Sequence, residues 1–351
     1  MNENASAMNH SVATDTESSV QAETGSVTNS AGPSPVHSDW TGPVIELRSV
    51  SRWFGTTHAV DNVSFAIPRG DVFGYIGPNG AGKTTTMRIL ATLEIPSEGD
   101  ARIEGLSSVN DPDLVRARLG FMPDAFGTYR NTNCAEYLDF YARSHGLIGR
   151  QRTARMRWVM DFTGLRALAD KPISGLSKGM RQRLCLGRAL IHDPAVLILD
   201  EPAAGLDPRA RIELRKIIRT LAADGKTILI SSHILTELAE MCDRVGIIEQ
   251  GRLLATGTVD EIRGDTSTSR SVCVELLDAP EAALTLLRDI ESVSQLRLDG
   301  LRVHFLVRGD RSTQVAVLKT LMKADMPIVQ FRSEDQSLED VFLAVTRGHV
   351  Q

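Results

Sequence analysis

A glycine-rich segment, residues 77–84, reads GPNGAGKT and satisfies the pattern G-x-x-x-x-G-K-[ST]. It follows the short apolar run Val72–Ile76 and precedes a helix expected to begin near Lys83. Its glycines let successive backbone N–H groups and the helix N-terminus face a phosphate. Lys83 adds a point charge for the β- and γ-phosphates, and the Thr84 hydroxyl can ligate Mg²⁺. The residues expected to line this phosphate site are Gly77, Pro78, Asn79, Gly80, Ala81, Gly82, Lys83, Thr84 and Thr85.

Two adjacent acids follow a second apolar run. Val196–Leu199 has the character of a buried strand, and it delivers Asp200 and Glu201 at its carboxyl end. Asp200 can hold Mg²⁺ from the side opposite Thr84, and Glu201 can polarise the attacking water. One acid after a strand is common, but two neighbouring acids supply both a metal partner and a base, so this pair predicts phosphoryl-transfer chemistry.

Further motifs decide the class of nucleotide protein. Residues 176–183 read LSKGMRQR, with Ser177 lying 23 residues before Asp200. Residues 201–207 read EPAAGLD, residues 231–233 read SSH, and residues 54–55 read FG. In order and spacing these segments resemble the signature motif (usually written LSGGQ), the D-loop, the switch histidine and the aromatic A-loop of ATP-binding-cassette (ABC) ATPases. The resemblance covers about residues 44–262. It implies an α/β fold, a P-loop NTPase of the ABC ATPase type with a helical subdomain at about 125–175.

The resemblance also implies roles for single residues. The signature helix of one subunit points its N-terminus at the γ-phosphate held by the other subunit, which assigns phosphate contacts to Ser177 and Gly179. Phe54 would stack on adenine and His233 would face the nucleotide. Asp207 would belong to the D-loop and also cap its helix. The plainer interpretations are a helix cap for Ser177, a core position for Phe54 and a structural histidine for His233.

Three positions depart from the family pattern. Lys178 and Met180 replace the second glycine and the final glutamine of the usual signature. Asp124 stands in the Q-loop, residues 120–124 (GFMPD), where many relatives have glutamine. A carboxylate oxygen can still approach Mg²⁺, although it adds negative charge beside a triphosphate. The metal site is therefore expected at Thr84, Asp200 and Asp124.

Within the family, three features resemble the drug-exporter, daunorubicin-resistance-like type. They are the LSKGMRQR signature with its EPAAGLDP segment, the Q-loop carboxylate and a C-terminal segment, residues 336–343, that reads QSLEDVFL. This resemblance implies an ATPase subunit that pairs with a separate six-helix membrane permease, contacted near residues 125–175. Two copies would close head to tail on two MgATP, and hydrolysis would reopen them. The chain would work in the cytoplasm, peripherally on the inner face of the membrane.

Composition limits the other possibilities. A length of 351 residues suggests about two domains, and 42% hydrophobic with 24% charged residues is an ordinary globular balance. No apolar run approaches the roughly 20 residues of a membrane-spanning helix.

Residues 1–40 hold five acids and no Lys or Arg, which leaves 39 acids against 39 basic residues in the rest. We expect this tail to be disordered, and the neutral remainder argues against nucleic acid as a partner. Four widely spaced cysteines suit a reducing cytoplasm.

The organisation follows from the apolar pattern. Strands and helices alternate over 44–264, with a helix capped by Asp207 and Pro208 and a hairpin turn at Gln250-Gly251. Residues 264–269 read as a linker. Beyond it we expect a small C-terminal α+β (ferredoxin-like) module over 270–351 with βαββαβ order. Its elements are strand 271–276, helix 280–289, strands 292–298 and 301–308, helix 312–324, strand 327–332 and a last helix, 337–347.

Two other functions remain as alternatives. A soluble ABC ATPase that acts on ribosomes normally carries two cassettes, and one that acts on DNA carries a long coiled coil or a zinc insert; this sequence has one cassette, no heptads and no cysteine pairs. A GTPase would need an N-K-x-D base reader, which is missing from the sequence. The transported substrate would be chosen by the permease and is not encoded here.

Overall fold

The computed structural model describes residues 40–125, 127, 131–234, 238, 240–264 and 269–334. The expected tail before Trp40, part of the expected linker (265–268) and the expected last helix 337–347 lie outside the described residues. The same is true of four residues, 126 and 128–130, at the start of the expected helical subdomain.

A six-stranded, mostly parallel sheet forms the centre of the ATPase region, with the order β10-β9-β3-β8-β7-β6. Its strands are β3 (Val72–Ile76), β6 (Leu119–Met122), β7 (Val196–Leu199), β8 (Thr227–Ser232), β9 (Arg244–Glu249) and β10 (Arg252–Thr258). All but β10 run parallel. Every residue of β3, β7 and β8 is buried, because the sheet is covered on both faces. The two strands predicted from uninterrupted apolar runs, β3 and β7, are confirmed.

Parallel strands bring their carboxyl ends to one edge of the sheet. β3 leads there into the glycine-rich segment, β8 into His233, β7 into Asp200 and β6 into Asp124. These strands are neighbours in the order β3-β8-β7-β6. The topology therefore gathers at one edge residues that lie up to 156 positions apart in the chain, from Gly77 to His233.

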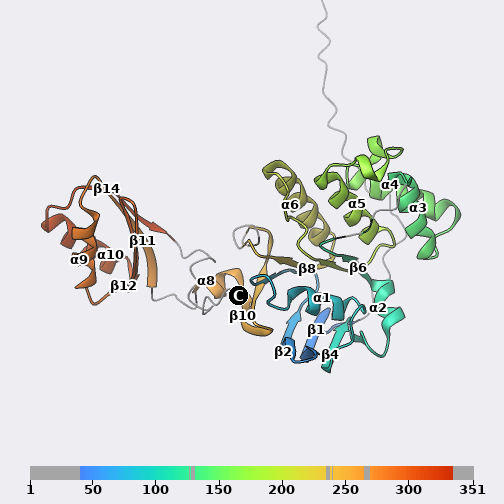
Figure 1. Ribbon diagram of the computed structural model, residues 1–351, viewed down its shortest axis with the longest axis horizontal. Coiled ribbons are helices and arrows are strands. Elements are labelled where there is room, and N and C mark those ends of the chain that lie inside the picture. The colour runs from blue at the N-terminus through green and yellow to red at the C-terminus, as the bar shows by residue number, and fades with distance from the viewer. Residues whose placement is uncertain are drawn as a thin grey trace, which may run out of the picture. The chain divides into compact units, whose positions relative to one another are not determined.

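A second, antiparallel sheet covers one face of the parallel sheet together with α1 (Lys83–Leu90), and both lie on the same side of β8 in Figure 1. Its strands β1 (Ile45–Phe54), β2 (Thr57–Ile67), β4 (Glu98–Ile103) and β5 (Leu106–Ser107) have the order β2-β1-β4-β5. The Phe65 ring of β2 stacks on Phe73 of β3 with centroids 5.0 Å apart. This aromatic contact joins the two sheets into one buried core.

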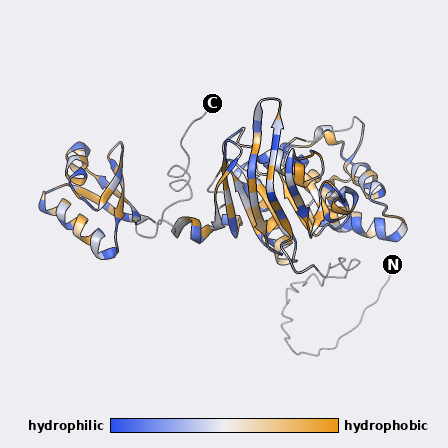
Figure 2. Ribbon diagram, turned by 90° about the horizontal axis from the view of Figure 1, so that it is seen from below, coloured by the Kyte–Doolittle hydropathy of each residue, from blue (hydrophilic) through white to orange (hydrophobic). Residues whose placement is uncertain are grey.

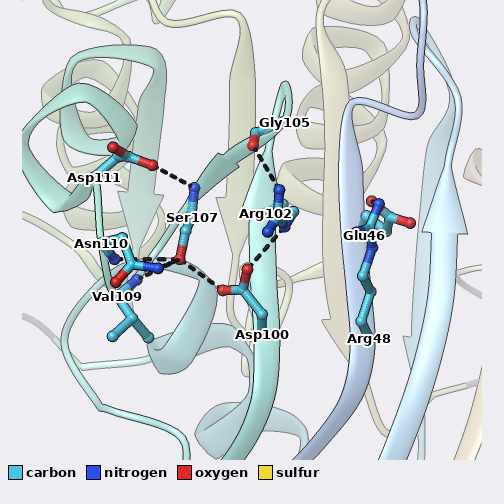
Figure 3. A network of polar contacts seen from close by, with 9 residues as sticks. All are labelled: Glu46, Arg48, Asp100, Arg102, Gly105, Ser107, Val109, Asn110 and Asp111. Carbon is cyan, nitrogen blue, oxygen red and sulfur yellow. Dashed lines mark hydrogen bonds and ion pairs between the residues drawn. The ribbon is translucent and has the colours of Figure 1, made fainter.

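The turn after β5 is held by the buried hydroxyl of Ser107 (Figure 3). Ser107 donates to Asp100 Oδ1 at 2.7 Å and accepts from the backbone N–H groups of Val109 and Asn110, both at 3.2 Å. Arg102 Nε donates to the other carboxylate oxygen of Asp100 at 2.8 Å. These hydrogen bonds fix the path of the chain from β5 to α2 (Pro112–Arg118).

Helices cover the opposite face of the parallel sheet, above β6 and β8 in Figure 1. They are α3 (Cys134–Ser144), α4 (Gly149–Phe162), the 3₁₀ turns Arg166–Leu168 and Ile173–Gly175, α5 (Lys178–Leu190) and α6 (Pro208–Ala223). α3 begins at a capping box in which Asn133 and Glu136 exchange side-chain and backbone hydrogen bonds. α6 has the predicted cap at Asp207 with Pro208 in its first turn. α3 and α4 occupy the region expected to be the helical subdomain.

The C-terminal module has the predicted βαββαβ order. It contains β11 (Ser269–Leu276), α9 (Pro280–Arg288), β12 (Val293–Asp299), β13 (Arg302–Arg308), α10 (Arg311–Lys323) and β14 (Ile328–Glu334). The antiparallel sheet order β12-β13-β11-β14 is that of a ferredoxin-like fold. Alternate residues Val303, Phe305 and Val307 are buried in a cluster with side chains from α9 and α10, which supply the covering layer. α8 (Val259–Gly264) precedes the module in the chain.

Apolar and polar residues alternate along the helices in Figure 2. Among the described residues, no helix is long and apolar enough to cross a bilayer.

Candidate nucleotide site

The glycine-rich segment curls because three of its glycines cannot carry a side chain. A Cβ on Gly77 would collide with the carbonyl oxygen of Ile248, and one on Gly82 would collide with that of Ala59. Gly80 and Gly82 have φ of 80° and 104°, which L-residues rarely adopt. Gly82 is the N-cap of α1, so the loop ends where the helix N-terminus begins. A loop with this backbone fits a phosphate ligand, which is bound by N–H groups at close approach.

Lys83 lies under this loop. Its ammonium donates to the carbonyl oxygens of Gly77 at 2.6 Å and Pro78 at 3.1 Å, and it lies 3.6 Å from Glu201 Oε1. The side chain is only 6% exposed. Burial lowers the pKa of Lys83, while the negative charges of Glu201 and Asp200 oppose that shift. The lysine therefore links the phosphate loop to the two acids that follow β7.

Asp200 is the buried acid of the site, at 1% exposure. Burial raises the pKa of Asp200, and hydrogen bonds from the Ser231 and Thr84 hydroxyls oppose that shift. The negative charges of Glu201 and Asp124 raise the pKa further. A carboxylate and a threonine hydroxyl in hydrogen-bond contact are both hard oxygen ligands, which is the donor type that Mg²⁺ takes; their role as metal ligands stays a prediction.

Glu201 stands between two basic side chains. Its Oε2 lies 2.8 Å from His233 Nδ1, while its Oε1 faces Lys83. The Glu201 side chain is 14% exposed and that of His233 is 46% exposed, so the pair opens toward solvent. Glu201 has φ of 48°, a conformation that non-glycine residues seldom adopt outside functional sites and turns. This geometry lets Glu201 act on a water molecule approaching from the exposed side.

Ser231 joins the two acids, and the sequence analysis assigned it no role. Its hydroxyl donates to Asp200 Oδ1 at 2.6 Å and accepts from the backbone N–H of Glu201 at 2.8 Å. The side chain is fully buried at the carboxyl end of β8. The sequence did contain a signal for this role: Ser231 is a polar residue at the carboxyl end of an apolar strand, two residues before His233.

The signature segment forms a capped helix start. Ser177 is the N-cap of α5 and accepts from the backbone N–H of Met180 at 3.3 Å. Gly179 lies against Leu206 and Ala210 of the D-loop region, and Asp207 accepts from the backbone N–H of Ala210 at 2.9 Å. The capping roles are confirmed; the phosphate contacts of Ser177 and Gly179 stay predictions.

Phe54 ends β1 with 46% of its surface exposed, so the alternative of a core position is wrong. The guanidinium of Arg52 lies 4.5 Å from the centroid of the Phe54 ring. An exposed aromatic face is what stacking on a flat base requires, and that role stays a prediction. Asp124 is exposed at the end of β6, where its charge acts on Asp200.

The predicted site residues fall into two groups. Contacts or charge effects link Lys83, Thr84, Asp200 and Glu201 to one another, and His233 and Asp124 join them. Within the part of the chain that the structure describes, Phe54, Ser177, Gly179 and Asp207 make no hydrogen bond or ion pair with the acids of this site.

This fold and this site define a P-loop ATPase of the ABC type. A family described as "ABC transporter" matches residues 60–204, and one described as "ATP-binding protein DrrA1-3-like, C-terminal domain" matches residues 257–346. The chain belongs to the ABC transporter ATP-binding proteins.

Similar proteins include two curated bacterial relatives. A Nod factor export ATP-binding protein from Ralstonia nicotianae is 33% identical, over 87% of this chain and 94% of that protein. A daunorubicin/doxorubicin resistance ATP-binding protein from Streptomyces peucetius is also 33% identical, over 87% of this chain and 92% of its own. Among solved structures, an ATP-binding subunit of an ABC transporter is 30% identical with a TM-score of 0.59, covering 64% of this chain and 93% of that one.

Proposed function

We propose that this chain binds and hydrolyses ATP as one of two identical subunits that close head to tail on two MgATP and drive export through a separate membrane permease. Export is supported by relatives named for Nod factor export and for daunorubicin/doxorubicin resistance. Residues 44–264 would form the ATPase domain and 270–351 an accessory domain. The chain would sit in the cytoplasm, against the inner face of the membrane.

The observation that carries the proposal is the position of Glu201 between Lys83 and His233. The carboxylate lies 3.6 Å from the Lys83 ammonium on one side and 2.8 Å from the His233 imidazole on the other, at the edge of the phosphate loop. Lys83 would bind the β- and γ-phosphates, which places the γ-phosphate beside Glu201. Glu201 would then polarise the attacking water, and His233 would orient the carboxylate.

Mg²⁺ would be held by Thr84 and Asp200, with Asp124 approaching from β6. Bound Mg²⁺ neutralises charge that develops on the transferred phosphoryl group. Asp200 is held in place by Ser231, so a metal ligand is fixed before the nucleotide arrives.

A second copy completes the site in this proposal. Ser177 caps α5 and the first turn of that helix contains no acid, so the helix N-terminus keeps its positive potential for an anion. The described contacts of Ser177 and Gly179 are with their own helix and the D-loop region, which leaves their phosphate contacts to the nucleotide of another subunit. ATP that bridges both copies binds the closed state preferentially and therefore drives closure.

The permease would contact the helical region around 125–175. Two large apolar side chains there are well exposed, with Phe140 of α3 at 56% and Ile148, the N-cap of α4, at 74%. Both side chains lie in the segment expected to meet the permease, and their exposure leaves them available to a protein partner.

Three variants of the purified chain test this function. We expect Glu201→Gln to bind MgATP, to hydrolyse it about 10² to 10⁴ times more slowly, and to accumulate as an ATP-bound dimer in sedimentation analysis. Lys83→Ala should lose nucleotide affinity, whereas Ser177→Arg should keep the ATP affinity of the monomer and block dimerisation. Glu98→Gln, which removes an exposed acid from the start of β4, is the matched control and should behave as wild type.

Two results would contradict the proposal. Near-normal turnover of Glu201→Gln removes this residue as the base. Loss of ATP binding by monomeric Ser177→Arg shows that Ser177 serves the nucleotide of its own chain, and the head-to-tail arrangement is then wrong.

A further inference from the structure

Arg52 covers one face of the Phe54 ring. The central carbon of its guanidinium lies 4.5 Å from the ring centroid, a distance at which a cation is attracted to an aromatic face. Phe54 is nevertheless 46% exposed, so part of the ring stays accessible. A flat base that stacks on this ring must therefore use the face that the guanidinium leaves open.

An ion pair with Glu94 holds the guanidinium in this position. Arg52 Nη2 donates to Glu94 Oε1 at 2.6 Å, and the two side chains are only 25% and 20% exposed. A charge-assisted hydrogen bond of this length, partly shielded from water, is stronger than one between neutral groups. The arginine is therefore fixed over the ring from its other side.

Glu94 lies in the loop that connects α1 to β4, and this loop is attached at both ends. The Glu94 N–H donates to the Arg88 carbonyl oxygen in the last turn of α1 at 3.2 Å. The Ser97 N–H donates to the Ser51 carbonyl oxygen in β1 at 2.7 Å. α1 begins at the phosphate loop, so the helix that starts at the phosphate site also leads to the acid that holds Arg52.

We propose that Arg52 is a positioning residue for the nucleotide base, which holds the Phe54 ring on one face and leaves the other face for adenine. The inference rests on the proposed ATP binding and on the stacking role predicted for Phe54. It adds a physical link, through Glu94 and α1, between the place of the base and the place of the phosphates.

The charge of Arg52 has a second effect on stacking. Both faces of an aromatic ring carry partial negative charge, which opposes the face-to-face approach of another flat ring. A cation on one face attracts that charge and lowers it on the opposite face, where the base would lie. Arg52 thus increases the affinity for the base without contacting the nucleotide.

The test compares two ligands that share a diphosphate, MgADP and magnesium pyrophosphate, by isothermal titration calorimetry on the purified full chain. Pyrophosphate has no base, so a residue that acts through the base changes the affinity for ADP alone. Arg52→Met keeps an unbranched side chain without the charge, and it should raise the Kd for MgADP about three- to tenfold, the size of one partly buried cation–π interaction. The Kd for pyrophosphate should not change.

Two further measurements show whether Arg52 acts through the ring. Phe54→Leu removes the ring and should raise the Kd for MgADP about fivefold or more. Adding Arg52→Met to Phe54→Leu should then have no further effect. In steady-state assays Arg52→Met should raise the KM for ATP by the same factor as the Kd for MgADP and leave kcat unchanged. Arg48→Met, which removes an arginine paired with Glu46 on the same strand, is the matched control and should bind both ligands like the parent.

Each contrary outcome has one meaning. An equal loss of pyrophosphate affinity would show that Arg52 acts on the phosphate loop or on the fold, and an unchanged Kd for MgADP would show that the ring needs no support. A further loss from Arg52→Met in the Phe54→Leu chain would show that Arg52 does not act through the ring. Each of these results overturns the inference and leaves the proposed ATPase function standing. If Phe54→Leu alone binds MgADP as tightly as the parent, the stacking role is wrong and the inference falls with it; a parent chain that binds neither ligand would overturn the proposed function itself.

Discussion

Replacing Ser231 with alanine removes the one hydroxyl that joins both acids of the site. Two hydrogen bonds disappear together, the 2.6 Å bond to Asp200 Oδ1 and the 2.8 Å bond from the Glu201 N–H. Ser231 is fully buried and Asp200 is 1% exposed, so water cannot take over either bond without rearrangement.

The size of the effect follows from these two bonds. A hydrogen bond to a charged group is worth about 1.5 to 3 kcal/mol, and a buried N–H left without an acceptor costs about 1 to 3 kcal/mol. Allowing for partial relaxation, the free energy of unfolding of the ATPase domain should fall by about 2 to 4 kcal/mol. Because burial raises the pKa of Asp200 and the Ser231 hydroxyl opposes that shift, the variant should have a still higher pKa at Asp200. Protons would then compete better with Mg²⁺, most strongly at low pH.

The assay pairs urea denaturation with Mg²⁺ titrations of ATPase activity at two pH values. All three tryptophans precede residue 264, so their fluorescence follows the ATPase domain. Ser232→Ala is the matched control: Ser232 is also buried, but among the described residues its hydroxyl makes a single hydrogen bond, which it accepts from the Ile234 N–H at 2.9 Å. The reasoning is refuted if Ser231→Ala and Ser232→Ala lose the same stability and need the same Mg²⁺ concentration.

Two further predictions concern a buried ring and a glycine. Burial, and then the neighbouring stacked His145, hold the pKa of His192 down to about 3. The unfolded chain takes up this proton first, so stability is complete above about pH 6.5 and should fall by about 1.4 kcal/mol per pH unit below it. His192→Asn should flatten that slope in denaturation curves between pH 6.5 and 5, and an unchanged slope would rule out His192 as its source. Gly77→Ala forces a methyl group against the Ile248 carbonyl, so it should cost about 1 to 3 kcal/mol and abolish nucleotide binding, whereas Gly175→Ala has room. Equal melting temperatures for these two glycine variants would contradict the close approach.

Local sequence patterns predicted the helices and strands that depend on residues close together in the chain. The buried strands β3 and β7 were found from uninterrupted apolar runs, with the bounds that the structure has. Asp207 and Pro208 predicted the start of α6, because capping depends only on neighbouring residues. In the module, each described element starts and ends within two residues of its expected position.

The antiparallel sheet escaped prediction. β1 and β2 pair along most of their length, but register shifts interrupt the pairing at Leu47/Val50, Val50/Arg52 and Arg52/Trp53. Such irregularities break the alternation of buried and exposed residues that reveals a strand in a sequence. The exposure of Phe54 could not be read from sequence either, since it depends on where β1 ends.

The sequence by itself determined the family and identified the candidate residues of the site: the glycine-rich loop, the two acids after β7 and His233. This was possible because a curved phosphate loop, a helix cap and a strand buried on both faces each require particular residue types at short, fixed spacings. Only the tertiary structure decided which groups meet across the fold. Ser231 of β8 reaches Asp200, which follows the neighbouring strand β7. Lys178, at the start of α5, lies against Gly205 of the D-loop. These contacts depend on the order of strands and the packing of helices, and no local spacing records that order.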